Sequence, residues 1–263
     1  MEKEIEKSLK EINHYLQECL KSTGGMAKNL EKAMHYSVFP GGKRIRPLLV
    51  MAISKILGLN AKKILPVACG IELIHCFSLV HDDLPCMDND DYRRGKPTCH
   101  RKFDEAQAIL AGDALLCLGI REIARCGKSE AVIKTCDALG SDGMAGGQSL
   151  DMIYKDRKAS QKIKNWIDRK KTGELFSICF EIPAIVKGCR EKEKGMLKKI
   201  GILFGQAFQI LDDLLDREGN EEVLKTELTV KVRNLMHIAE KSGKKSRMLC
   251  SLIKMIFGKF VDI

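Results

Sequence analysis

Apolar residues recur at helical spacing through nearly the whole chain. The first such stripe is Ile5, Leu9, Ile12, Leu16 and Leu20, separated by charged and polar residues. Spacings of three and four place all five on one face of an α-helix. Only 6 of the 263 residues are proline, so few positions would interrupt long helices. No segment alternates with the period of two expected of a half-buried strand.

The same pattern predicts helices along the rest of the chain, with a Gly/Pro-containing loop over Arg94 to Phe103. The expected helices are Leu48 to Leu57, Val67 to Val80, Glu105 to Arg125, Glu130 to Leu150, Ile163 to Val186, Glu191 to Leu215, Glu227 to Lys241 and Ser246 to Val261. We therefore predict an all-α fold, a single-domain bundle of long helices around a central cavity.

The charge balance indicates an anionic partner. With 45 Lys and Arg against 35 Asp and Glu, the formal net charge is +10. Nucleic acid is disfavoured, because the chain has one Trp, four Tyr, no recognisable nucleic-acid-reading motif and two dense acidic clusters. A polyphosphate bridged by metal ions fits both signs of charge.

The chain is expected to be cytoplasmic, without a membrane span. No uninterrupted apolar run reaches about 18 residues, and the first residues lack a signal-peptide core. The eleven cysteines include no Cys-x-x-Cys pair. Cys69, Cys76, Cys117 and Cys179 lie in apolar helical patterns, which favours buried free thiols in a reducing compartment.

The first acidic cluster runs from His81 to Asp91. In a continuous helix Asp82 and Asp88 would point about 120° apart, but Pro85 ends the helix and lets the chain bring Asp88 back beside Asp82. Mg²⁺ typically takes one or two carboxylates and fills its other positions with water and substrate phosphate. A solvated acidic turn or a calcium loop is the alternative for this cluster taken alone.

The second cluster continues an apolar helix. Asp212 and Asp216 fall about 40° apart on one face, and Gln209 precedes Asp212 by three residues. A single Asp-Asp-x-x-Asp is a weak signal. Two aspartate clusters on core-like helices, with basic motifs before and between them, indicate a metal and diphosphate site.

Basic residues complete this set. The loop from Phe39 to Pro47 contains Lys43, Arg44 and Arg46, which can aim donors at one diphosphate. A solvated basic turn is the alternative. His75 lies seven residues before Asp82, about 20° from it around the helix, and is either a ligand or a core hydrogen-bonding residue. Gly173 interrupts an apolar helix at a cost of about 1 kcal/mol against alanine, so it serves packing or access.

These residues resemble the trans-isoprenyl diphosphate synthases, in particular the bacterial farnesyl and the bacterial or plastid geranylgeranyl diphosphate synthases. The resemblance extends from about Ala33 to Asn220. Its motifs are Gly41 to Pro47, Asp82 to Asp88, Arg93-Arg94-Gly95, Gly112-Asp113, Gly146-Gly147-Gln148, Lys171-Thr172-Gly173 and Gln209 to Asp216.

The resemblance implies an isoprenoid synthase fold, a homodimer, and condensation of an allylic diphosphate with isopentenyl diphosphate. Isopentenyl diphosphate would be held by Lys43, Arg46, His75 and Arg94. The allylic substrate would be served by Arg93, Lys171, Thr172 and Gln209, of which Lys171, Thr172 and Gln209 are the expected catalytic residues. Mg²⁺ would be bound by Asp82, Asp88 and Asp212, supported by Asp83 and Asp216.

Product length is expected to depend on Phe77 and Ser78, which lie about 6 to 7.5 Å below Asp82 along the helix. A phenylalanine there can form the floor of the cavity, although Phe77 could also be ordinary core packing. The resemblance implies that a bulky aromatic at this position stops growth at fifteen carbons. Farnesyl diphosphate is therefore the predicted product, with geranylgeranyl diphosphate as the alternative.

The sequence departs from these relatives after Asp216. They continue with a Gly-Lys, Gly-x-Asp and Lys-x-Thr-Tyr stretch that supplies another diphosphate-binding lysine. Here Arg217 to Lys225 runs almost directly into a helix, so the domain, taken as residues 1–263, is shortened after about residue 220. A catalytically weak or silent partner subunit is thus a second hypothesis. A terpene cyclase is a third, disfavoured by the second diphosphate-binding set.

Overall fold

The computed structural model describes residues 2–22, 24–39, 41–155, 157–217 and 219–262. Pro40 and Glu218, which belong to two of the segments discussed above, lie outside the described residues. The helices are α1 (Glu2–Cys19), α2 (Lys28–Val38), α3 (Ile45–Ile56), α4 (Ala61–Asp82), α5 (Cys99–Lys102), α6 (Glu105–Ala124), α7 (Ser129–Leu139), α8 (Met144–Tyr154), α9 (Gln161–Asp168), α10 (Glu174–Lys187), α11 (Glu191–Asp216), α12 (Glu221–Lys241) and α13 (Arg247–Phe257).

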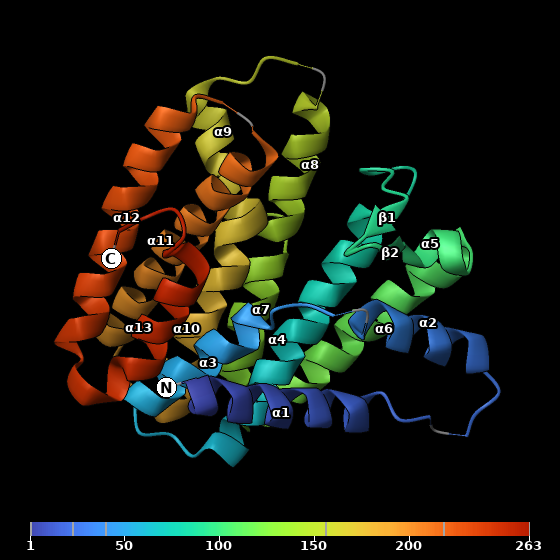
Figure 1. Cartoon of the computed structure of the whole chain (residues 1–263). Coiled ribbons are helices and arrows are strands. Elements are labelled where there is room, and N and C mark those ends of the chain that lie inside the picture. Colours follow the sequence, from blue (N-terminus) through green and yellow to red (C-terminus); the bar gives the residue numbers. More distant parts are fainter. Residues whose placement is uncertain (1, 23, 40, 156, 218, 263) are drawn as a thin grey trace.

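The predicted all-α bundle is confirmed (Figure 1). A π-helical turn, η1 (Arg169–Gly173), joins α9 to α10, and a 3₁₀ turn, η2 (Gly243–Ser246), precedes α13. The strands of the described residues are β1 (Tyr92–Arg93) and β2 (Lys96–Pro97), which pair antiparallel in a small hairpin. This hairpin and α5 occupy most of the segment that we expected to be loop.

One helix prediction was wrong, and one helix was not predicted. The single helix expected over residues 130–150 is broken between α7 and α8, where the chain turns tightly. A side chain at Gly143 would place Cβ 2.3 Å from the carbonyl oxygen of Ala138, so the turn requires glycine. Helix α2 was not predicted, although Leu30, Ala33, Met34 and Val38 recur at helical spacing within it.

The core lies between α3, α4, α6, α10 and α11. Helices α4 and α6 approach so closely that a Cβ on Gly70 would lie 2.6 Å from the carbonyl oxygen of Gly119. In the other half of the molecule Phe176, Phe204 and Phe257 form a chain of ring contacts with centroids 5.3 and 5.5 Å apart. These contacts hold the helices that form the cavity walls.

By length and composition alone, helix α4 is long and apolar enough to cross a membrane, although it contains no uninterrupted apolar run of that length. In the structure 61% of its most apolar window is buried inside the molecule, as expected for a core helix. Cys69, Cys76 and Cys179 are buried as predicted, whereas the prediction for Cys117 was wrong because it lies on the exposed face of α6. The sequence pattern could not show that Cys117 is left exposed by the described residues.

Candidate active site

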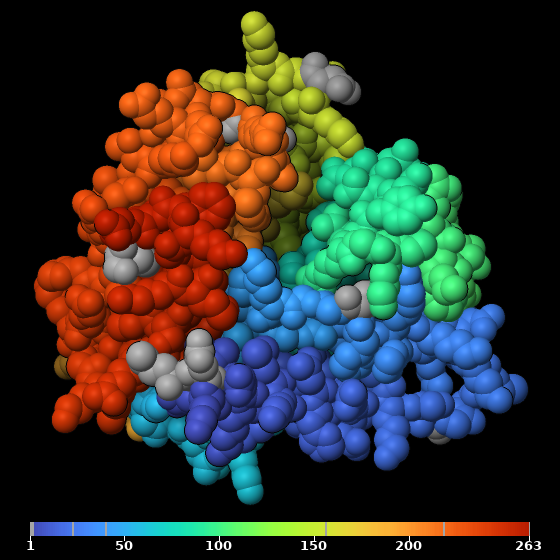
Figure 2. Space-filling model, viewed as in Figure 1, coloured from blue at the N-terminus to red at the C-terminus, as the bar shows by residue number. Residues whose placement is uncertain are grey.

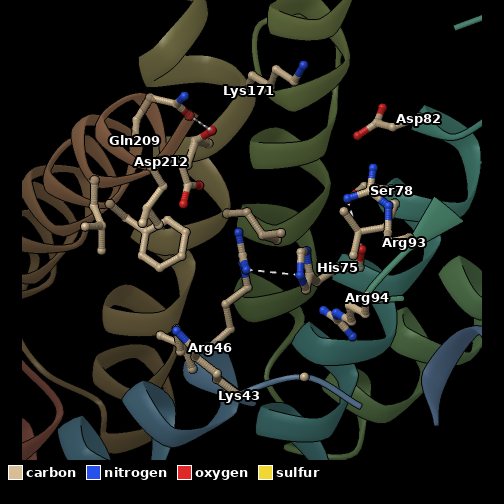
Figure 3. Close-up of a pocket in the computed structure, with 18 of the residues that line it drawn as sticks. Lys43, Arg46, His75, Ser78, Asp82, Arg93, Arg94, Lys171, Gln209 and Asp212 are labelled. Carbon is tan, nitrogen blue, oxygen red and sulfur yellow. Dashed lines mark hydrogen bonds between the residues drawn. The ribbon is translucent and has the colours of Figure 1, made fainter. Parts of the chain in front are cut away.

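A cavity of about 910 Å³ opens between the N-terminal and C-terminal halves of the bundle. Figure 2 shows the surface hollowed between the orange C-terminal helices and the green hairpin. The principal predicted metal ligands and substrate-binding residues line this cavity, together with Ser78: Lys43, Arg46, His75, Asp82, Asp88, Arg93, Arg94, Lys171, Thr172, Gln209 and Asp212. The structure thus brings together motifs that are more than a hundred residues apart (Figure 3).

The first acidic cluster lies where α4 ends. Asp82 is the last residue of the helix, and the chain then turns so that the backbone N–H of Asp88 donates to the carbonyl oxygen of Asp82 at 2.9 Å. The curl expected at Pro85 is therefore present, and both aspartates face the cavity. Burial, assisted by the nearby Asp88 carboxylate, raises the pKa of Asp82 to about 6 against the partial compensation of Lys171.

The second acidic cluster lies on α11 and faces the first cluster across the cavity. Asp212 and Asp216 line the cavity, and burial together with the charge of Asp216 raises the pKa of Asp212 to about 6. Asp213 points to a different neighbour, because its carboxylate accepts a hydrogen bond from Gln209 at 2.9 Å. The two walls therefore present carboxylates whose ionisation is unfavourable in the absence of a cation.

The π-helical turn η1 supplies Lys171 and Thr172. The Nζ of Lys171 lies 2.6 Å from the carboxylate of Asp151 on α8. Thr172 donates to the amide oxygen of Gln209 at 2.8 Å. Burial acts to lower the pKa of Lys171, but the ion pair with Asp151 and the charges of Asp82 and Asp88 outweigh it and raise the pKa. Lys171 is therefore cationic at neutral pH.

The Gly146-Gly147 motif explains how α8 reaches η1. A Cβ on Gly147 would lie 2.5 Å from the backbone nitrogen of Lys171, so only glycine permits this contact. The close approach places Asp151 within reach of the lysine. Gln148 follows on the same helix, and its buried amide nitrogen has no hydrogen-bond partner among the described residues.

Arg46 and His75 form the basic floor of the cavity. An Nη of Arg46 lies 3.2 Å from Nε2 of His75 (Figure 3). The Arg46 guanidinium also lies over the ring of Phe176, 4.4 Å from its centroid. Burial, reinforced by Arg46 and Arg94, lowers the pKa of His75 well below its ordinary value. His75 is therefore neutral, and its Nε2 accepts from Arg46.

The three cations of the basic loop point in different directions. Lys43 is exposed at the cavity rim. Arg44 is buried in a left-handed conformation, with φ of 51°, and donates to the carboxylate of Glu72 at 2.8 Å and to the carbonyl oxygen of Val38 at 2.7 Å. Arg44 thus anchors the loop to Glu72 of α4, which lies one turn before His75 on the same helix.

The paired arginines of the hairpin are held separately. Arg93 donates to Asp83 at 2.6 Å and to Asp90 at 3.1 Å. Arg94 donates to the carbonyl oxygen of Gly41. A Cβ on Gly42 would lie 2.7 Å from the Arg94 guanidinium, so Gly42 lets this arginine lie against the basic loop.

A second, largely apolar chamber of about 600 Å³ adjoins the cavity. Ser78, Asp82, Met144 and Lys171 line both spaces. Phe77 lines only the apolar chamber, where it lies opposite residues of α8 such as Met152. The polar cavity therefore continues past Asp82 into a space suited to a hydrocarbon chain.

The donor set fits Mg²⁺. No group of three or more His, Cys, Asp or Glu side chains gathers around one point in the described part of the chain. Mg²⁺ does not need such a group, because it usually takes one or two carboxylates and completes its shell with water and phosphate. Paired carboxylates on two facing walls match this requirement.

Sequence reasoning missed two residues that support these groups. Asp151 holds Lys171, and the spacing Gln148-x-x-Asp151 on one helical face was the available signal. Lys155 donates to the carbonyl oxygen of Met87 and lies 3.8 Å from the carboxylate of Asp88.

Two residues considered from the sequence have other partners in the structure. Asp83, expected to assist the metal, is buried and paired with Arg93 instead. Lys225, considered as a replacement diphosphate-binding lysine, pairs with Glu221 on the surface.

Comparison with known proteins agrees with this arrangement. Residues 27–230 match the model of the Polyprenyl synthetase family. The farnesyl diphosphate synthase of Bacillus subtilis is 42% identical over 205 residues, which cover 75% of this chain and 69% of the relative. Geranylgeranyl pyrophosphate synthase 4 of Arabidopsis thaliana is 38% identical and covers 75% of this chain and 56% of the relative.

Solved structures extend the likeness over the whole bundle. The geranyltranstransferase of Thermotoga maritima has a TM-score of 0.89 at 32% identity, covering 98% of both chains. An FPP/GFPP synthase of Zymomonas mobilis also has a TM-score of 0.89, at 33% identity, covering 97% of this chain and 98% of that one. On the family match and these identities, this chain is a member of the polyprenyl synthetase family.

Proposed function

We propose that this protein is a Mg²⁺-dependent trans-prenyltransferase that condenses an allylic diphosphate with isopentenyl diphosphate and releases farnesyl diphosphate as its main product. The observation that carries the proposal is a cavity with facing carboxylates and a basic floor that continues into an apolar chamber. The allylic diphosphate would lie at the carboxylates, isopentenyl diphosphate on the basic floor, and the hydrocarbon tail in the apolar chamber. The names of the bacterial relatives support the same reaction.

Mg²⁺ would be held by Asp82 and Asp88 on one wall and by Asp212 on the other. When bound, it supplies positive charge that stabilises the diphosphate leaving group as the allylic carbon–oxygen bond breaks. Lys171 and Arg93 add fixed positive charge beside the same wall. The Thr172–Gln209–Asp213 hydrogen-bond chain orients the Gln209 amide at the allylic half of the site.

Isopentenyl diphosphate would occupy the basic floor. Arg46 is suited to this role because its buried Nε–H has no hydrogen-bond partner among the described residues. Neutral His75 holds the guanidinium, and Lys43 and Arg94 close the rim. The double bond of isopentenyl diphosphate then attacks the allylic cation, and the proton lost from it passes to the departing diphosphate. Apolar walls exclude water that would otherwise quench the cation.

The proposed function is tested by incubating the purified chain with Mg²⁺, isopentenyl diphosphate and dimethylallyl diphosphate. We expect farnesyl diphosphate as the main product after dephosphorylation and chromatography. A predominance of geranylgeranyl diphosphate would favour the alternative suggested by the plant relatives. If only binding of prenyl diphosphates is found, the chain is instead a silent partner subunit.

We predict that Arg93 and Arg94 serve different substrates. Arg94→Ala should raise the KM for isopentenyl diphosphate by about tenfold and change the allylic KM little, because Arg94 lies against the basic loop. Arg93→Ala should do the reverse, because Arg93 lies beside the first acidic cluster. Steady-state kinetics with each substrate varied in turn measures both effects. Equal changes in the two KM values for either variant would refute this division.

We predict that Phe77→Ala lengthens the product. The Phe77 ring borders the apolar chamber below Asp82, so removing it leaves a deeper space for the growing chain. Each further isoprene unit then fits without steric conflict, and geranylgeranyl diphosphate should become the main product. Chromatography of the dephosphorylated products of both proteins provides the comparison. An unchanged distribution of product lengths would show that Phe77 does not limit chain growth.

We also propose that the chain works as a homodimer in the cytoplasm, as one synthase domain shortened after residue 220. Helix α6 exposes Ile109 and Leu110 side by side, and α7 and α8 expose Ile133 and Ile153. Exposed apolar residues in such numbers favour burial against a second copy. Light scattering after gel filtration tests this, with twice the monomer mass of 29.5 kDa expected.

A further inference from the structure

His81 lies beside Phe77 on α4, between the apolar chamber and α6. The two residues are one turn apart, and their rings meet edge to face with centroids 4.9 Å apart and an interplanar angle of 75°. Both side chains line the apolar chamber. One side of the Phe77 ring therefore rests on the imidazole of His81.

Helix α6 fixes the same imidazole. Its Nε2 lies 3.1 Å from the carbonyl oxygen of Ile109, and because a carbonyl can only accept, Nε2–H is the donor. The Asp113 carboxylate lies 3.9 Å from this nitrogen. The ring is thus held from the α6 side by a directional hydrogen bond with an acidic group behind it.

Gly112 is the part of α6 that admits the imidazole. A Cβ at this position would lie 2.2 Å from Nε2 and 2.4 Å from Cδ2 of His81, so a larger residue would force the imidazole out of this place. Glycine destabilises a helix interior relative to alanine, so its presence here needs a reason. The seating of His81 provides one, and it gives a role to the Gly112-Asp113 motif that the reaction itself does not use.

We propose that His81, seated on Gly112, is a positioning residue for product chain length, because it holds the Phe77 ring across the end of the apolar chamber. This inference rests on the proposed prenyl transfer and extends it. The floor then has two layers. The upper layer is the Phe77 ring, and the lower layer is the His81 imidazole, which lies at the contact between α4 and α6. Without the imidazole, the Phe77 side chain gains a rotamer that points toward α6, and the chamber deepens.

The test compares the products of His81→Ala and Gly112→Ala with those of the wild type. We expect the ratio of C20 to C15 products to rise about threefold to tenfold in both variants, in line with the strength of an edge-to-face ring contact. In a Phe77→Ala background, His81→Ala should leave the ratio of C20 to C15 products unchanged, because its influence on that ratio passes through Phe77. If Gly112→Ala does not fold, the product ratio of His81→Ala alone tests the proposal.

Gly119→Ala is the matched control. Its Cβ would lie 2.6 Å from a side-chain carbon of Ile74, so it disturbs the same α4–α6 contact two turns away from His81. We expect a lower Tm and an unchanged product ratio. A shift as large as that of Gly112→Ala would show a general loosening of the two helices and overturn the proposal.

A binding measurement separates this inference from the proposed function. The affinities for geranylgeranyl and farnesyl diphosphate are compared in the presence of Mg²⁺, which requires no turnover. A wild type that binds both but makes no product, with His81→Ala favouring the longer ligand, would defeat the proposed function and sustain the role of His81. Unchanged product ratios and unchanged relative affinities in His81→Ala would overturn the inference.

Discussion

Asp82→Asn is expected to reduce turnover by about a thousandfold or more while leaving the fold intact. The carboxylate ends α4 at the junction of the polar cavity and the apolar chamber, and it is the proposed metal ligand common to both. Asparagine has almost the same shape but provides no negative charge. Initial rates with saturating substrates and Mg²⁺ measure the effect, and turnover within tenfold of the wild type would exclude the metal role.

The same substitution should stabilise the metal-free protein above pH 6. Burial raises the pKa of Asp82 to about 6 in the folded state, above the ordinary value of 3.8. The folded state therefore binds more protons than the unfolded state between these values, and stability falls as the pH rises through 6. In Asp82→Asn this loss is absent, so its Tm should exceed that of the wild type at pH 7.5 and approach it at pH 5.

Asp91→Asn is the control for both measurements. Asp91 belongs to the same acidic segment but is exposed and pairs with Arg101 on the surface. We expect unchanged turnover and an unchanged Tm in this variant. A loss of activity similar to that of Asp82→Asn would mean that the total negative charge of the segment matters, and not the position of Asp82.

Arg46→Gln is expected to raise the KM for isopentenyl diphosphate by about a hundredfold. Arg46 is desolvated, which lowers its pKa, and its Nε–H has no hydrogen-bond partner among the described residues. A diphosphate oxygen would satisfy this donor in surroundings where a charge-assisted hydrogen bond is strong. The allylic KM should change much less, and steady-state kinetics with each substrate varied in turn gives both values.

Lys43→Gln provides the comparison for Arg46. Lys43 is exposed at the rim, so its interaction with a diphosphate is screened by solvent and salt. We expect a smaller increase in the isopentenyl diphosphate KM that disappears at high salt, whereas the effect of Arg46→Gln should persist. Equal effects of the two variants at both salt concentrations would contradict the placement of Arg46 at the deep end of the site.

The positions of neighbouring groups along one helix could be predicted from the sequence. His75 and Asp82 line one cavity, as do Asp212 and Asp216, because the helical rotation per residue fixes which side chains share a face. The turn that returns Asp88 to Asp82 could also be predicted, because proline ends a helix by its own covalent geometry. These are local effects, and local geometry is encoded within a few residues.

Contacts between distant segments were decided only by the tertiary structure. Arg44 and Arg46 are two residues apart in one basic loop, yet Arg44 is directed into the protein by its left-handed backbone and by Glu72. Asp151 meets Lys171 only because Gly147 lets α8 approach η1.

The seating of His81 on Gly112 has the same origin. Neither the period of α4 nor that of α6 indicates which residues of the two helices will face each other. The sequence by itself determined most of the helices and most of the groups that carry the chemistry, because each depends on residues close together in the chain. Which cation faces the cavity, and which residue supports it, depended on close packing between helices, which no local spacing specifies.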